Sequence, residues 1–183
     1  MASLEQRRAA IATLLGQLKY LPFAQRQRMA MHIRRQASAQ AQQARQAAML
    51  SSAQLRQLHA AGMGVGAHTV SHPILATLSN RAAQLDIANG RRQLEELIQA
   101  PVSLFAYPNG KAGRDYGPTH VDIVRQLGFD AAVTTDWGVA RAGHNLDLLQ
   151  LPRFTPWDQG RLAFLWRLRQ NRLWAAPARQ DGS

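Results

Sequence analysis

Residues 64–73 run Gly-Val-Gly-Ala-His-Thr-Val-Ser-His-Pro. We predict a short buried strand over residues 64–69, with His68 near its end and His72 in the following turn. Two imidazoles four residues apart can converge on one metal ion if the intervening backbone turns like a helix, and neutral imidazole suits Zn, Co, Ni or Fe. The alternative is a loop with two unrelated polar residues. The glycines before the pair and Pro73 after it favour the metal interpretation, because they place the pair at a strand end.

The chain around this segment alternates between strand-like and helix-like patterns. We expect helices at residues 3–20, 52–59, 80–99, 118–127 and 159–174, and strands at residues 64–69, 102–107, 130–135 and 148–154. Residues 23–48 are rich in Ala, Gln and Arg and predict only weakly amphipathic helix. Strands that alternate with helices across short loops predict a parallel α/β sheet with right-handed crossovers.

Polar or loop-forming groups lie at the carboxyl ends of the four expected strands. They are His68 with His72, then Tyr107-Pro108-Asn109-Gly110, then Thr134-Thr135-Asp136, and finally Arg153. In parallel α/β folds the chemistry gathers at the carboxyl ends of the strands. We therefore expect these groups to lie on one face.

The same segments resemble a known family, the polysaccharide deacetylases (the NodB-homology domain). Residues 66–73 resemble its histidine motif, and Phe-Ala-Tyr-Pro-Asn-Gly at 105–110 resembles its next motif. Residues 128–135 and 151–154 resemble its closing strands. The resemblance covers roughly residues 50–158. It implies a partial, distorted (β/α) barrel, here with an N-terminal helical segment.

The resemblance also implies a chemistry. Members of the family remove acetyl groups from carbohydrate polymers with a divalent metal. Removal of N-acetyl groups makes them hydrolases of carbon–nitrogen (non-peptide) bonds, and some members remove O-acetyl groups instead. The resemblance assigns His68 and His72 as metal ligands, with zinc as the expected metal. It makes the backbone N–H after Tyr107 a candidate for stabilising the oxyanion, with Pro108 and Gly110 turning the loop toward substrate.

Other residues near these motifs are supporting candidates. Asp136 could orient a neighbouring side chain, and Arg153 could pair with a catalytic carboxylate. Trp137 could stack on a sugar ring, although a packing role is equally consistent with its position. Asn109 is either a substrate contact or a turn residue.

The family's first motif, an Asp-Asp pair that supplies the general base and the third metal ligand, has no counterpart here. No Asp-Asp pair occurs in the sequence, and Glu95-Glu96 lies within an expected helix. We therefore expect a C-terminal portion of a deacetylase domain, inactive alone. Its expected parts are a basic helical excursion (1–50), the partial deacetylase domain (51–158) and a basic amphipathic helix with tail (159–183).

Charge and composition limit the other function classes. The 183 residues carry a formal charge of +11 and no cysteine, which excludes disulfides and a thiol nucleophile. Residues 1–60 hold nine Lys/Arg and one acid, whereas residues 61–160 hold eight basic and nine acidic residues. The near-neutral middle argues against a nucleic-acid binder. Two alternatives stay open. One is a non-catalytic carbohydrate-binding remnant, and the other, less favoured, is a basic binder of a membrane surface, through residues 161–174, or of nucleic acid.

The N-terminal residues show no apolar segment typical of a signal peptide. The default expectation is a cytoplasmic protein, with the cell envelope as the alternative if a preceding segment is missing.

Overall fold

The computed structural model describes residues 3–36, 49–140, 146–154 and 160–173. The chain divides into two units, Met1–Gly64 and Val65–Ser183. Among the described residues, no helix combines the length and apolarity that a membrane span requires.

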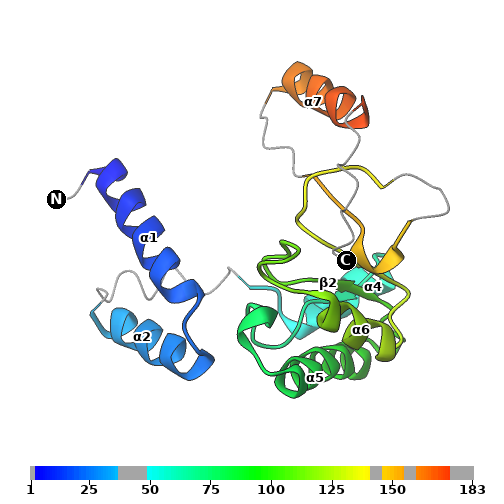
Figure 1. The fold of residues 1–183 in the computed structure, drawn as a ribbon, viewed down its shortest axis with the longest axis horizontal. Coiled ribbons are helices and arrows are strands. Elements are labelled where there is room, and N and C mark those ends of the chain that lie inside the picture. Colours follow the sequence, from blue (N-terminus) through cyan, green and yellow to red (C-terminus); the bar gives the residue numbers. More distant parts are fainter. Residues whose placement is uncertain (1–2, 37–48, 141–145, 155–159, 174–183) are drawn as a thin grey trace. The chain divides into compact units, whose positions relative to one another are not determined.

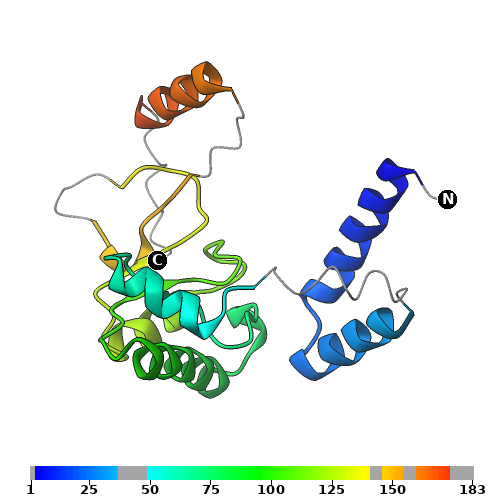
Figure 2. The same ribbon diagram turned by 180° about the vertical axis from the view of Figure 1, so that it is seen from behind.

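The first unit is helical. Helix α1 (Leu4–Lys19) and helix α2 (Phe23–Gln36) are separated at Pro22 and form a helical pair (Figures 1 and 2). Helix α4 (Ser52–Ala60) follows later in the chain. Ser3 and Ser51 begin α1 and α4 with capping boxes, in which the serine hydroxyl and a glutamine three residues later satisfy each other's backbone N–H groups. The helices expected at 3–20 and 52–59 are therefore confirmed.

The second unit is built on a parallel sheet of three short strands in the order β1-β2-β3. They are β1 (Gly66–Ala67), β2 (Leu104–Ala106) and β3 (Ala131–Val133). Gly66 pairs with Leu104, and Leu104 pairs with Ala131, so the strand ends lie in register. The parallel arrangement expected from the sequence is confirmed, although each strand is shorter than expected.

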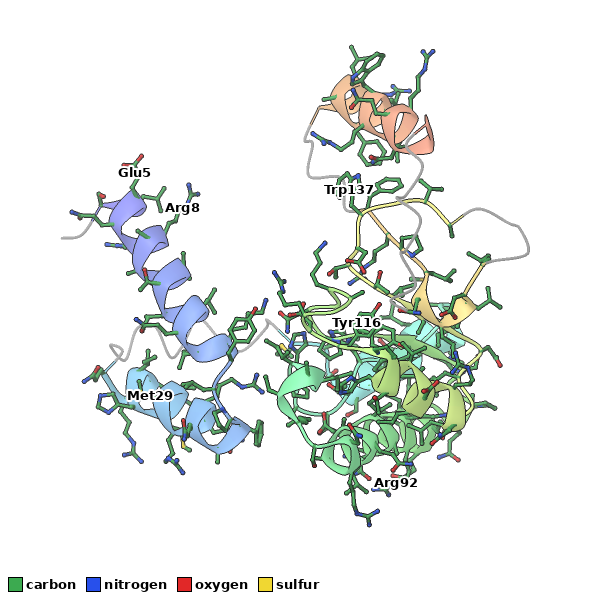
Figure 3. The ribbon with its side chains drawn as sticks, in the orientation of Figure 1. Glu5, Arg8, Met29, Arg92, Tyr116 and Trp137 are labelled. Carbon is green, nitrogen blue, oxygen red and sulfur yellow. The ribbon has the colours of Figure 1, made fainter. Side chains whose placement is uncertain are left out.

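Two helices form the crossovers of this sheet. Helix α5 (Asn80–Ile98) joins β1 to β2, and helix α6 (Pro118–Gln126) joins β2 to β3. They lie side by side, and Arg92 projects from the outer surface of α5 (Figures 1 and 3). The apolar positions of both helices and of the sheet form the core: Ala83, Ile87, Val102, Phe105, Val121, Val124 and Ala132.

The prediction of a strand at residues 148–154 is wrong for the first half of that range. Residues Leu148–Gln150 form a 3₁₀ turn, because the Asp147 carboxylate accepts the backbone N–H of Leu149 at 3.0 Å and caps it. Leu151 then makes a single parallel bridge with Val133. Helix α7 (Arg161–Leu173) follows and matches the expected C-terminal helix. The observed fold is mixed α/β with three parallel strands.

Candidate functional site

His68 follows β1 directly, and its ring is oriented by the neighbouring strand. Its Nδ1 atom lies 2.7 Å from the carbonyl oxygen of Ala106, the last residue of β2. A carbonyl oxygen only accepts, so Nδ1 carries the proton and donates it. The Nε2 atom of neutral His68 therefore keeps its lone pair. This is the arrangement of metal-binding histidines, whose second nitrogen donates to a carbonyl or carboxylate.

His72 lies against His68. The ring centroids are 4.7 Å apart with an interplanar angle of 75°. The backbone between them is not helical, because Thr69 and His72 have left-handed φ values of 64° and 50°. The backbone N–H of His72 donates to Thr69 Oγ1 at 3.1 Å and closes this turn. The structure thus brings together the two imidazoles that the sequence singled out.

The electrostatic environment of His68 favours its neutral form. Burial lowers the pKa of His68 below its usual value, and the Ala106 hydrogen bond opposes that shift. Coulombic interactions with His72 and Arg153 lower the pKa of His68 further, which places Arg153 within electrostatic range of His68. A neutral imidazole is the form that binds a metal.

Two imidazoles can provide two nitrogen ligands of a divalent metal site. Catalytic zinc sites usually have three protein ligands and an open position. Within the described ranges, no group of three or more His, Cys, Asp or Glu side chains is placed to hold a metal ion. Among the described residues, His68 and His72 are the two candidate ligands of such a site.

Tyr107 is fully buried, with its ring packed in the core. Its ring stacks on Tyr116 at 4.0 Å and meets the edge of Phe105 at 5.1 Å. The side chain of Tyr116 is labelled in Figure 3. Tyr116 is a core residue that the sequence patterns do not single out. The backbone of Tyr107, rather than its ring, is the part that can border a site.

The backbone donors of the Tyr107–Gly110 loop correct one expectation. The residue after Tyr107 is Pro108, which has no N–H to stabilise an oxyanion. The N–H of Tyr107 donates to the carbonyl of Val133 at 3.1 Å, and that of Gly110 donates to the carbonyl of Pro108 at 2.7 Å. Asn109 therefore holds the remaining candidate N–H of this loop.

Thr135 fixes the turn at the end of that loop. Asn109 and Gly110 are both left-handed, with φ values of 60° and 71°. The Thr135 hydroxyl donates to the carbonyl of Asn109, and the Thr135 N–H donates to the carbonyl of Gly110 at 2.9 Å. A Cβ atom at Gly110 would lie 2.9 Å from the Thr135 nitrogen. The close approach and the positive φ together require glycine.

Asp136 joins three loops. Its carboxylate accepts the N–H of Ala112 at 3.3 Å and lies 3.9 Å from Lys111 Nζ, while its carbonyl accepts the N–H of Arg153 at 3.1 Å. Lys111 Nζ also donates to the carbonyl of Thr135 at 2.7 Å. These contacts hold the loops after β2 and β3 together, and the backbone of Asp136 holds Arg153.

Trp137 is half-buried, and its ring has protein partners. It lies 6.0 Å from the ring of Phe154, and its indole N–H donates to Asn171 Oδ1 of α7 at 3.1 Å (Figure 3). These contacts are those of the packing alternative. Sugar stacking by Trp137 stays a prediction, as do the substrate roles of Pro108 and Asn109.

The sequence profile of the polysaccharide deacetylases matches residues 17–132, and the chain belongs to that family. The profile begins within α1, before the segments that carry the resemblance in sequence motifs.

Among solved structures, the chain is similar to a Streptococcus pyogenes deacetylase, PplD, in complex with acetate. That match has 28% identity and a TM-score of 0.53, over 61% of this chain and 47% of PplD. A second similar structure is IcaB from Ammonifex degensii, with 30% identity and a TM-score of 0.50, over 59% of this chain and 49% of IcaB.

A curated relative is YxkH of Bacillus subtilis (strain 168), which is named for the polysaccharide deacetylases. It is 22% identical over 111 residues, which is 61% of this chain and 38% of YxkH. The chain thus spans less than half the length of each of these relatives.

Proposed function

We propose that this chain carries the histidine-bearing part of a carbohydrate deacetylase site, which removes acetyl groups from N-acetylated or O-acetylated sugars with a divalent metal. One observation carries the proposal. The carbonyl of Ala106 holds Nδ1 of His68, so that Nε2 is available beside the ring of His72. Membership of the polysaccharide deacetylases supports the reaction class. The three parallel strands support an arc of the family's distorted barrel.

The chain's own residues would act by orientation. When bound, a divalent metal such as zinc polarises the acetyl carbonyl and activates water. His68 and His72 would hold the metal in their neutral forms. The Asn109 N–H is the candidate donor to the oxyanion, on a turn that Thr135 fixes. Arg153, held by the Asp136 carbonyl, places a positive charge near His68, where it could orient a catalytic carboxylate.

An assay with zinc and an acetylated chito-oligosaccharide tests this proposal. With two ligands among the described residues, we expect weak zinc binding and little acetate release by the purified chain. Zinc binding should be lost in His68→Ala and His72→Ala and kept in His32→Ala, since His32 lies on the separate helix α2. Equal zinc binding by all four proteins would refute the ligand assignment.

The same assay separates the two carbohydrate hypotheses. Oligosaccharide binding that is indifferent to zinc, with no acetate release, would favour the non-catalytic carbohydrate-binding alternative. Zinc-dependent acetate release would show that the chain is an active enzyme.

A membrane surface is a second candidate partner, supported by α7. Leu162, Leu165 and Trp166 are 83%, 50% and 59% exposed, and residues 161–173 contain no acid. Such a helix can bind an anionic lipid surface. Trp174, which belonged to the predicted segment, lies outside the described residues. We expect the chain to co-sediment with vesicles of mixed anionic and neutral lipids. The double variant Trp166→Gln, Leu162→Gln should lose this binding. Equal sedimentation of the variant and the wild type would exclude α7 as a membrane-binding surface.

A further inference from the structure

The two histidines meet because the loop between them has a particular backbone shape. Thr69 and His72 are left-handed, and Thr69 is β-branched, a residue type that is rarely found there. Such a conformation is maintained only when the surrounding structure enforces it. Within the loop, the hydrogen bond between His72 N–H and Thr69 Oγ1 contributes. Two contacts from outside the loop also act on it, and they come from α5.

Gly90 lets α5 approach the loop closely. It is a buried glycine inside a helix of 19 residues, where glycine is unfavourable relative to alanine. A Cβ atom there would lie 2.8 Å from the carbonyl carbon of Thr69 and 2.9 Å from its oxygen. Both are backbone atoms, so a side chain at Gly90 would have to displace either the helix or Thr69. The glycine thus fixes the position of the residue that follows His68.

Asp86 holds the same loop one helical turn earlier. Residues 86 and 90 are four apart, so they lie on one face of α5. The Asp86 carboxylate oxygen Oδ2 lies 3.4 Å from both the backbone N–H donor and the hydroxyl of Ser71. Ser71 directly precedes His72. Asp86 and Gly90 therefore contact the loop beside each of the two histidines.

We propose that Asp86 and Gly90 are positioning residues of the histidine pair. On helix α5, Gly90 allows a close contact with the backbone of Thr69, and Asp86 accepts hydrogen bonds from Ser71. Together these contacts fix the loop so that the two imidazoles lie against each other. Asp86 does not touch a metal in this role. Its importance for metal binding rests on the proposed function, whereas its effect on the two rings in the metal-free chain does not.

The test uses the full chain and two readouts. The first is the nuclear Overhauser contact between the ring protons of His68 and His72 in metal-free protein. The second is zinc affinity by calorimetry. Asp86→Ala removes the acceptor, whereas Asp86→Asn keeps an oxygen that can accept from Ser71. Gly90→Ala introduces the Cβ atom.

Two matched controls are available in the chain. Gly16 is a helical glycine of α1 where an added Cβ atom would have nothing within 4 Å, so Gly16→Ala repeats the chemical change without the close approach. Asp122 is an exposed acid of α6 paired with Arg125, so Asp122→Ala repeats the loss of a carboxylate away from the loop.

We expect Asp86→Ala and Gly90→Ala to lose the ring contact and to bind zinc about 10-fold more weakly, as for other residues that orient ligands. Asp86→Asn and both controls should keep the contact and the affinity. If Asp86→Ala and Gly90→Ala both retain them, the proposal is overturned. If Gly90→Ala does not fold, the comparison of Asp86→Ala with Asp86→Asn decides. If wild type binds no zinc while the ring contact follows the expected pattern, the positioning role stands and the metal role of the proposed function fails.

Discussion

The Nδ1 atom of His68 lies 2.7 Å from the carbonyl oxygen of Ala106. The end of β2 therefore determines which ring nitrogen of His68 carries the proton and which keeps its lone pair. The two residues are 38 positions apart in the chain. They meet because Ala67 pairs with Phe105 in the parallel register, and the next residue of each strand lies beside the other. Strand register thus determines the protonation pattern of the candidate ligand.

Titration of His68 by NMR should report this environment. We expect a pKa below the usual value of 6.5, mainly because of burial, and Nδ1-protonated imidazole above that pKa. Arg153→Met should raise the pKa of His68, because a positive charge that disfavours the imidazolium is removed. Arg92→Met is the control, since Arg92 is an exposed residue of α5 paired with Glu96. An unchanged pKa in Arg153→Met would contradict the assigned proximity.

A comparison of Gly110 with Gly113 distinguishes the stability cost of a left-handed backbone from that of a close contact. Both have positive φ values, 71° and 73°, but only Gly110 has neighbours within 4 Å of a Cβ position. Alanine at Gly113 should cost about 1–2 kcal/mol for the left-handed conformation alone. Alanine at Gly110 should cost about 1–3 kcal/mol more, because it overpacks against Thr135 and the Tyr107 carbonyl. Urea denaturation of both variants measures the difference, and equal losses would refute the contact.

His120 should make stability depend on pH. Its Nδ1 accepts the N–H of Gly117 at 3.1 Å, and its Nε2 donates to the carbonyl of Leu75 at 3.1 Å, so both nitrogens are satisfied in the neutral ring. Burial lowers the pKa of His120, with the Leu75 hydrogen bond opposing. A lowered folded-state pKa means that the stabilisation is complete above the unfolded value of 6.5. It is lost as pH falls from there through the folded-state pKa.

His120→Gln provides the matched comparison. Glutamine at the third helical position can still accept from Gly117 but does not titrate. Its free energy of unfolding should therefore decrease less than that of wild type between about pH 7.5 and 5.5. His120→Ala should cost about 1–3 kcal/mol at about pH 7.5, because the Gly117 N–H loses its acceptor. An identical decrease in wild type and His120→Gln would show that another group controls acid stability.

Local signals in the sequence are sufficient for the crossover helices. Ser79 caps α5 and Gly128 follows α6 in a left-handed conformation, and both effects act within a few residues. The Asp147 cap is equally local, but the apolar residues beside it mimic a strand, so the pattern does not reveal the turn at Leu148–Gln150. Local propensity therefore predicts the order and type of the elements better than their ends.

The candidate site divides in the same way. The pairing of His68 with His72 follows from their spacing at a strand end, although it is made through a left-handed turn and not through the helical turn that this spacing predicts. The roles of Gly90, Asp86 and Thr135 do not, because each depends on a segment that is distant in the chain and close in space. An isolated glycine in a helical pattern indicates a close approach only when the partner backbone is known.

Thr69 provides a direct test of how the histidine loop is stabilised. Its hydroxyl accepts the N–H of His72 at 3.1 Å, and its left-handed φ costs about 1–3 kcal/mol for such a residue. Thr69→Ser keeps the acceptor and removes the β-branch, so it should be as stable as wild type or more so. Thr69→Val keeps the shape and loses the acceptor, so it should be less stable than Thr69→Ser by about 1 kcal/mol. Urea denaturation measures both. If the valine variant is as stable as the serine variant, the hydrogen bond does not hold the turn, and contacts from outside the loop, such as those of α5, must do so.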